Sequence, residues 1–137
     1  MQDQGRSASK YICVYNKTRE KFVATHATVA DGYFSRLVGL LGTTRRWARP
    51  GNGLWIVPSH GVHTIGMMYA LDLIFLDRQL TVVGVEEHVR PFRISKVSFK
   101  AESVLELPVH TVFRTETRVG DQMEISAVRA HEAPVAS

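Results

Sequence analysis

The sequence predicts a mainly β protein: a single compact β-barrel or jelly-roll-like sandwich with one amphipathic helix packed on the sheet. Short apolar runs, rich in β-branched and aromatic residues, recur between turn residues along the 137-residue chain, which is the pattern of such folds. One segment only, about 30–41, has apolar residues at helical spacing. Hydrophobic and charged contents of 45% and 22% exclude disordered, collagen-like and coiled-coil proteins.

The first half of the chain predicts a hairpin followed by the helix. Strands are expected at Tyr11–Tyr15 and from Phe22 to Ala24 or beyond, because both runs are apolar and a polar stretch separates them. In the helix, apolar side chains four residues apart form one face, and Gly42 suits the left-handed residue that commonly ends a helix.

The second half supplies the remaining strands, each bounded by Gly, Pro, Asp or Asn turn residues. They are expected at Leu54–Val57, Val62–Tyr69, Ala70–Leu76, Thr81–Val85, Ile94–Phe99, Ser103–Leu107 and Gln122–Val128. A short helical turn is expected near 112–117, and Gly120-Asp121 is expected to turn the chain into the last strand. One domain over 10–128 follows, with polar tails at 1–9 and 129–137.

Charge and cysteine content limit the classes of function. The chain has 17 Lys and Arg against 13 Asp and Glu, a net charge of +4, too modest to indicate a nucleic-acid partner by itself. Its one cysteine, Cys13, excludes an internal disulfide and a zinc site of paired thiolates. The apolar segment Val62–Leu76 is shorter than the roughly 20 residues of a membrane span. The polar first ten residues do not match a secretory signal, so we expect a cytoplasmic protein.

Five short motifs appear in a fixed order along most of the chain. They are Arg36–Gly42, His63–Met67, Leu71–Asp77, Val104–Pro108 and Val119–Asp121. Together they resemble domain-of-unknown-function family 192 (DUF 192), a group of small uncharacterised prokaryotic proteins. The resemblance covers roughly residues 25–125. It implies a compact β-rich domain of barrel or jelly-roll type and implies no activity.

Asp72 is the most unusual polar residue, because it stands inside an apolar strand. Alternation places it on one face with Ile74 and Leu76, so we expect it to be buried. A buried carboxylate is costly unless it has partners. The candidates are Arg36, His63 and Thr64. Two interpretations stay open: a structural network that anchors the helix or the His-Thr turn, or an imidazole that Asp72 orients for binding or base catalysis.

A metal site is an alternative built on histidine. His60 and His63 are three residues apart beside Gly61, and a turn that brings both rings together would leave one acid to complete a set of three ligands. The acids considered are Asp72 and Glu106, with His88 or His110 as further candidates. That arrangement would suit a hydrolase-like metal enzyme. The competing interpretation is a surface turn that carries two histidines.

Two basic regions contain aromatic residues, as single-strand binders do. They are residues 45–49 and 90–100, with Arg45, Arg46, Trp47, Arg49 and Arg93 as the candidate contacts. Usually such charges are a solvated surface and the aromatic covers the core.

The leading prediction is therefore a small binding or accessory module without an assigned activity, cofactor or partner. Its candidate ligand residues are Arg36, His63, Thr64, Asp72 and Glu106.

Overall fold

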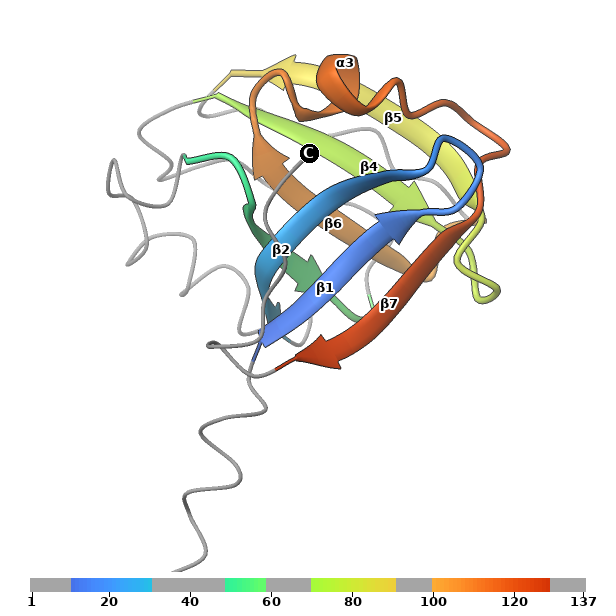
Figure 1. Cartoon of the computed structure of the whole chain (residues 1–137). Coiled ribbons are helices and arrows are strands. Elements are labelled where there is room, and N and C mark those ends of the chain that lie inside the picture. Colours follow the sequence, from blue (N-terminus) through green and yellow to red (C-terminus); the bar gives the residue numbers. More distant parts are fainter. Residues whose placement is uncertain (1–10, 31–48, 59–69, 91–99, 129–137) are drawn as a thin grey trace, which may run out of the picture.

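The computed structural model describes residues 11–30, 49–58, 70–90 and 100–128, which form seven strands and one short helix (Figure 1). The strands are β1 (Tyr11–Asn16), β2 (Lys21–Ala30), β3 (Asn52–Ile56), β4 (Leu71–Leu76), β5 (Val82–Val89), β6 (Ser103–Pro108) and β7 (Met123–Val128). The helix is α3 (Thr111–Thr115), between β6 and β7.

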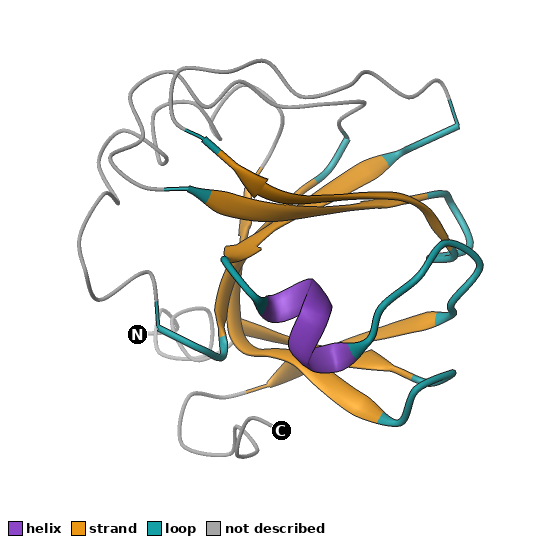
Figure 2. Cartoon of the chain, turned by 90° about the horizontal axis from the view of Figure 1, so that it is seen from above, coloured by secondary structure: helices purple, strands orange, loops and turns teal. Residues whose placement is uncertain are grey.

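All seven strands belong to one sheet, in the order β5-β4-β6-β3-β2-β1-β7. Neighbours are antiparallel except β2 and β3, which are parallel. Seen from above, the strands fall into two groups that face each other, and α3 lies to the side between them (Figure 2). The sheet is not closed into a barrel, because the edges β5 and β7 meet only beside the isolated bridge between Thr81 and Gln122. The predicted mainly β, sandwich-like class is confirmed.

Strand alternation produces two hydrophobic clusters. The larger lies inside the curved sheet and includes Ile74 and Leu76 of β4 together with Val112 of α3. The smaller lies on the opposite face and includes Leu73 and Phe75 of the same strand. Every residue of β4 and β6 is buried. These two strands are therefore the centre of the fold, and polar side chains on them are enclosed by apolar neighbours.

The predicted elements that fall on described residues are confirmed, with shifted ends. The strand expected from Phe22 continues to Ala30, the one expected at Thr81–Val85 is β5 and ends at Val89, and the helical turn is α3. Several predicted elements lie outside the described residues: the strands at 62–69 and 94–99, and the tails 1–9 and 129–137. The same is true of residues 31–41 of the predicted helix, whose expected first residue, Ala30, is the last residue of β2.

Candidate functional site

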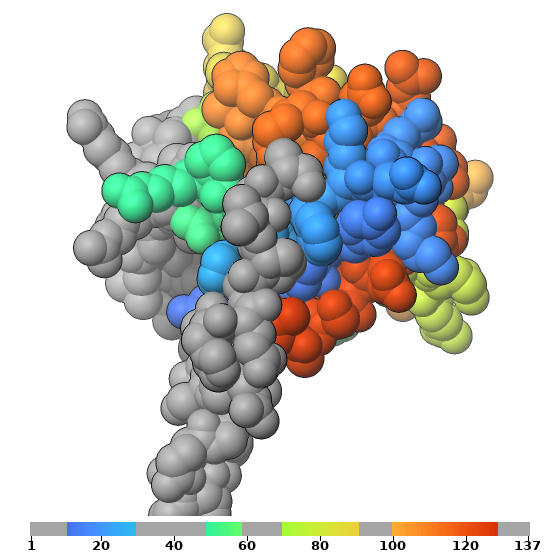
Figure 3. Space-filling view, in the orientation of Figure 1, coloured from blue at the N-terminus to red at the C-terminus, as the bar shows by residue number. Residues whose placement is uncertain are grey.

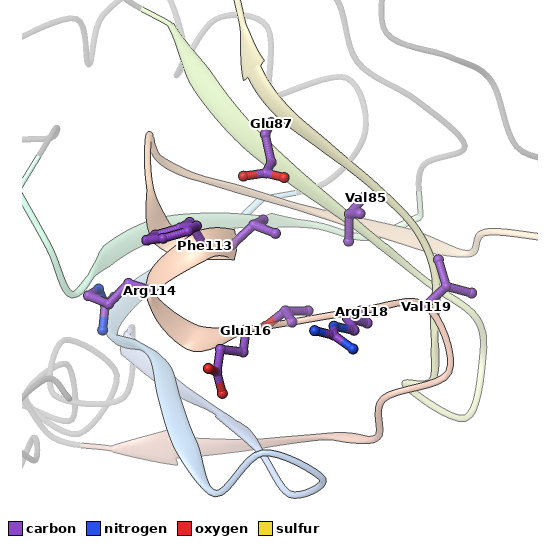
Figure 4. Close-up of a pocket in the computed structure, with 9 residues that line it drawn as sticks. Val85, Glu87, Phe113, Arg114, Glu116, Arg118 and Val119 are labelled. Carbon is purple, nitrogen blue, oxygen red and sulfur yellow. The ribbon is translucent and has the colours of Figure 1, made fainter.

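A cleft of about 590 Å³ lies between β5 and the segment from α3 to β7. Its lining comes from these two stretches: Val85, Glu87, Val112, Phe113, Arg114, Glu116, Thr117, Arg118 and Val119. Figure 4 shows the strand wall above, with α3 and the linker below; the linker is the segment 116–122 between α3 and β7. In the space-filling view, the α3 segment forms the upper edge of the molecule (Figure 3). Ligand sites commonly have volumes of about 300 to 1,000 Å³, so this cleft has the size of a small-molecule site.

Asp72 joins the two walls of the cleft. One carboxylate oxygen accepts the backbone N–H of His88 on β5 at 2.9 Å, and the other accepts the N–H of Val112 in α3 at 3.0 Å. The side chain is fully buried, as its strand position predicts. The donors are backbone groups, so Asp72 fixes the position of the helix start relative to β5.

The backbone beside Asp72 is irregular on both walls. The pairing of β4 with β5 shifts register between Leu71 and Leu73, which leaves a bulge on β5 opposite Asp72. His88 in this bulge has φ 55°, and His110 and Glu116 at the two ends of α3 have φ 75° and 57°. Left-handed conformations cost energy for residues other than glycine and cluster at functional sites. Three such residues lie around this cleft, so the backbone of its walls departs from regular strand and helix geometry.

Asp121 fixes the far end of the linker. Its carboxylate accepts hydrogen bonds from Asn16 Nδ2 at 3.0 Å, from Arg19 Nε and Nη2 at 3.0 and 3.1 Å, and from the Arg118 N–H at 3.0 Å. Burial by itself raises the pKa of Asp121, but these hydrogen bonds outweigh it and hold the pKa below its ordinary 3.8. The turn predicted at Gly120-Asp121 is confirmed. Gly120 has φ 99° and donates its N–H to the Val82 carbonyl at 2.8 Å.

The cleft carries charges of both signs and uncovered apolar side chains. Glu87 extends from β5, and Arg118 lies on the opposite wall (Figure 4). Glu116 faces Lys21, with Oε1 and Nζ 3.6 Å apart. Phe113 is 80% exposed and Val119 62% exposed, the two largest exposures among the large hydrophobic residues of the described ranges. Large apolar groups in water beside a cleft are typical of a binding surface.

Glu106 lies on the other face of the sheet. It pairs with Leu54 of β3 and Leu73 of β4, and paired residues share a face, so it points into the smaller apolar cluster. Within the described part of the chain, no hydrogen bond or ion pair reaches its carboxylate. Burial raises the pKa of Glu106 to about 7. Asp72 is on the opposite face, so these two predicted ligand residues are not brought together.

The other predicted site residues fall mostly outside the described ranges. These are Arg36, Arg45, Arg46, Trp47, His60, His63, Thr64 and Arg93, while Arg49 is exposed next to Pro50. Among the described residues, no three His, Cys, Asp or Glu side chains are grouped closely enough to hold a metal ion. No helix within the described ranges is long and apolar enough to cross a membrane.

The sequence reasoning missed Glu87, Phe113 and Arg118. The sequence predicts the helical turn that contains Phe113, but residue type alone does not reveal that its side chain is exposed. Glu87 and Arg118 are 31 positions apart and line one cleft only because α3 and the segment after it lie beside β5. The only available signal was the mixture of charged and apolar residues in 112–119, which is also typical of an ordinary surface turn.

Sequence comparison links this chain to uncharacterised proteins. The family model DUF192, described as an uncharacterized ACR, matches residues 14–125. A UPF0127 protein of Thermococcus sibiricus is 29% identical over an alignment 115 residues long, which covers 80% of this chain and 71% of the relative. A UPF0127 protein of Pyrococcus abyssi is 32% identical over an alignment 102 residues long, which covers 70% of this chain and 82% of the relative.

Two crystal structures share the fold. A protein of unknown function from Novosphingobium aromaticivorans superposes with a TM-score of 0.67 and 17% identity over 83% of each chain. A putative transcription regulator from Sinorhizobium meliloti has a TM-score of 0.64 and 21% identity over 82% of this chain and 90% of its own. Similarity at these identities is evidence for the architecture of the sheet alone.

Proposed function

This chain belongs to the uncharacterized DUF192 family, and from that premise we propose that it is a small-molecule-binding module whose ligand occupies the cleft between β5 and α3. The observation that carries the proposal is the exposed ring of Phe113 beside a cleft whose lining includes Val85 and Val112. A ligand that covers this apolar surface gains about 25 cal/mol for each Å² removed from water.

The rigidity of the walls supports binding. Asp72 holds β5 and α3 at one end, and Asp121 holds the linker at the other, each through several hydrogen bonds. A cleft shaped before the ligand arrives loses little conformational entropy on binding, and more of the contact energy is kept as affinity. In this proposal Asp72 is a positioning residue. It holds the two walls of the cleft in place and does not itself contact the ligand.

The metal-enzyme and nucleic-acid alternatives remain predictions. They depend on Arg49, which lies within the described residues, and on His60, His63, Arg45, Arg46 and Trp47, which lie outside them. The same is true of Arg36, His63 and Thr64 as ligand contacts. Glu106 is buried among apolar side chains on the opposite face of the sheet. It is therefore not a contact for a ligand bound in the cleft.

The test is binding of a neutral environment-sensitive dye, N-phenyl-1-naphthylamine, followed by fluorescence. We expect Phe113→Ala to weaken binding about tenfold or more, since burying an aromatic side chain contributes about 1.5 to 3 kcal/mol. Val29→Ala is the matched control, because Val29 is 46% exposed on β2 and does not line the cleft. Equal affinities of wild type and Phe113→Ala would rule out the cleft as the binding site.

We also propose a cytoplasmic location. The free thiol of Cys13 supports it, because cysteine persists unpaired in reducing compartments. Burial, and then the nearby Glu124, raise the pKa of this thiol, which makes it unreactive. Fractionation of cells against cytoplasmic and exported marker proteins tests the location, and recovery with the exported markers would contradict it.

A further inference from the structure

We infer that the ligand of the cleft is a small zwitterion with an apolar body, whose ammonium group binds Glu87 and whose carboxylate binds Arg118. This inference rests on the proposed function and adds the chemical class of the ligand. Its basis is the placement of one available acid and one available base on opposite walls, with apolar surface between them (Figure 4).

The four charged side chains of the lining are not equivalent. Glu116 already faces Lys21 at 3.6 Å. Arg114 is half-buried and has an interaction of its own, and Figure 4 shows it directed away from Glu87 and Arg118. Glu87 and Arg118 are both exposed, and neither side chain has a hydrogen bond or ion pair with another described residue. One acid and one base therefore remain for a ligand.

Both of these side chains extend from fixed backbone. Glu87 stands beside the bulge residue His88, whose N–H Asp72 accepts, and the N–H of Arg118 is accepted by Asp121. Their Cα positions are thus determined by buried carboxylates, while their side chains stay exposed. A ligand with groups at both ends can contact the two without moving the backbone.

Opposite charges on facing walls select against singly charged ligands. An anion attracted by Arg118 meets the carboxylate of Glu87, and a cation attracted by Glu87 meets the guanidinium of Arg118. A zwitterion satisfies both, with arginine well suited to a planar carboxylate. The apolar lining of Val85, Val112 and Phe113 then receives the body of the ligand. Short peptides with apolar side chains have this combination of groups.

The experiment measures binding of the dipeptide leucyl-phenylalanine by titration calorimetry, beside its N-acetylated and C-amidated forms. In the wild type, we expect each modification to weaken binding by about two- to fivefold, because each removes one charged contact at an exposed side chain. In Glu87→Gln, N-acetylation should lose its effect, while amidation keeps it. In Arg118→Gln, the pattern should reverse. Glu124→Gln and Lys17→Gln, at exposed positions outside the cleft, should behave as wild type.

The outcomes separate this inference from the proposed function. If the naphthylamine dye binds in the cleft but the blocked dipeptides bind as tightly as the free one, the ligand class is wrong and the binding site stands. If a hexapeptide blocked at both ends binds more tightly than the dipeptide, the cleft accepts a protein segment and the inference is overturned. If neither dye nor dipeptide binds, the proposed function itself fails.

Discussion

Asp72 links residue chemistry to the geometry of the cleft, because its two oxygens accept one backbone N–H from each wall. Asp72→Asn replaces one of those oxygens with an NH₂ group, which cannot accept. One of the two N–H groups, of His88 or Val112, then faces a donor. We expect unfolding to become easier by about 1 to 3 kcal/mol, the cost of a buried group left without its hydrogen bond.

Urea denaturation measures this change, and Glu124→Gln is the matched control because Glu124 is exposed on β7. The amide hydrogens of His88 and Val112 should also exchange faster in Asp72→Asn. An unchanged midpoint of denaturation would show that the carboxylate does not hold the two walls together.

The burial of Asp72 could be predicted from alternation along its strand, but its partners could not. Backbone N–H groups are present at every residue except proline, so residue types do not show which of them reach a given carboxylate. The predicted partners Arg36 and His63 lie outside the described residues. The prediction that Glu106 and Asp72 share one ligand site is wrong, because the strand register sets the two on opposite faces.

At the scale of elements, β3 tolerates little change because it lies between β2 and β6. A Cβ on Gly53 would lie 2.9 Å from Leu107 Cδ2 and 3.2 Å from the Glu106 carbonyl oxygen. We therefore expect Gly53→Ala to destabilise the fold by about 1 to 3 kcal/mol through overpacking.

The matched control is Gly84→Ala on β5, where the nearest contact of a new Cβ is Phe75 Cδ2 at 3.4 Å. This is close to an ordinary contact, and the loss of stability in thermal denaturation should be smaller than for Gly53→Ala. Equal losses in the two variants would mean that the close approach at Gly53 does not determine the effect, because the lower backbone entropy of alanine by itself favours both variants.

Element types were predictable because they depend on local patterns, while their assembly was not. The alternation of apolar residues predicted the strands, and the turn residues bounded them within a few positions. The parallel pairing of β2 with β3 and the meeting of β5 with β7 are contacts distant in sequence. The cleft depends on the placement of α3 beside β5, which is also a contact distant in sequence, so its lining residues could not be found from motifs.

At the scale of the whole molecule, Glu106 should make stability depend on pH. It lies on the central strand β6, 5% exposed, between Leu54 and Leu73. Burial raises its pKa from 4.5 to about 7 in the folded protein. Between these two values the folded state holds a proton that the unfolded state has released, so the free energy of unfolding falls as pH rises.

The contribution of Glu106 is complete below about pH 4.5 and is lost by about pH 7, a change on the order of 3 kcal/mol across the two pKa values. Glu106→Gln keeps a neutral side chain at every pH, so we expect it to remove this slope and to be more stable than wild type above pH 7. Urea denaturation from pH 4.5 to 8 measures both effects, with Glu124→Gln as the exposed control. If the free energy of unfolding of Glu106→Gln still fell with rising pH as in the wild type, another group would be responsible. The raised pKa of Glu106 would then be contradicted.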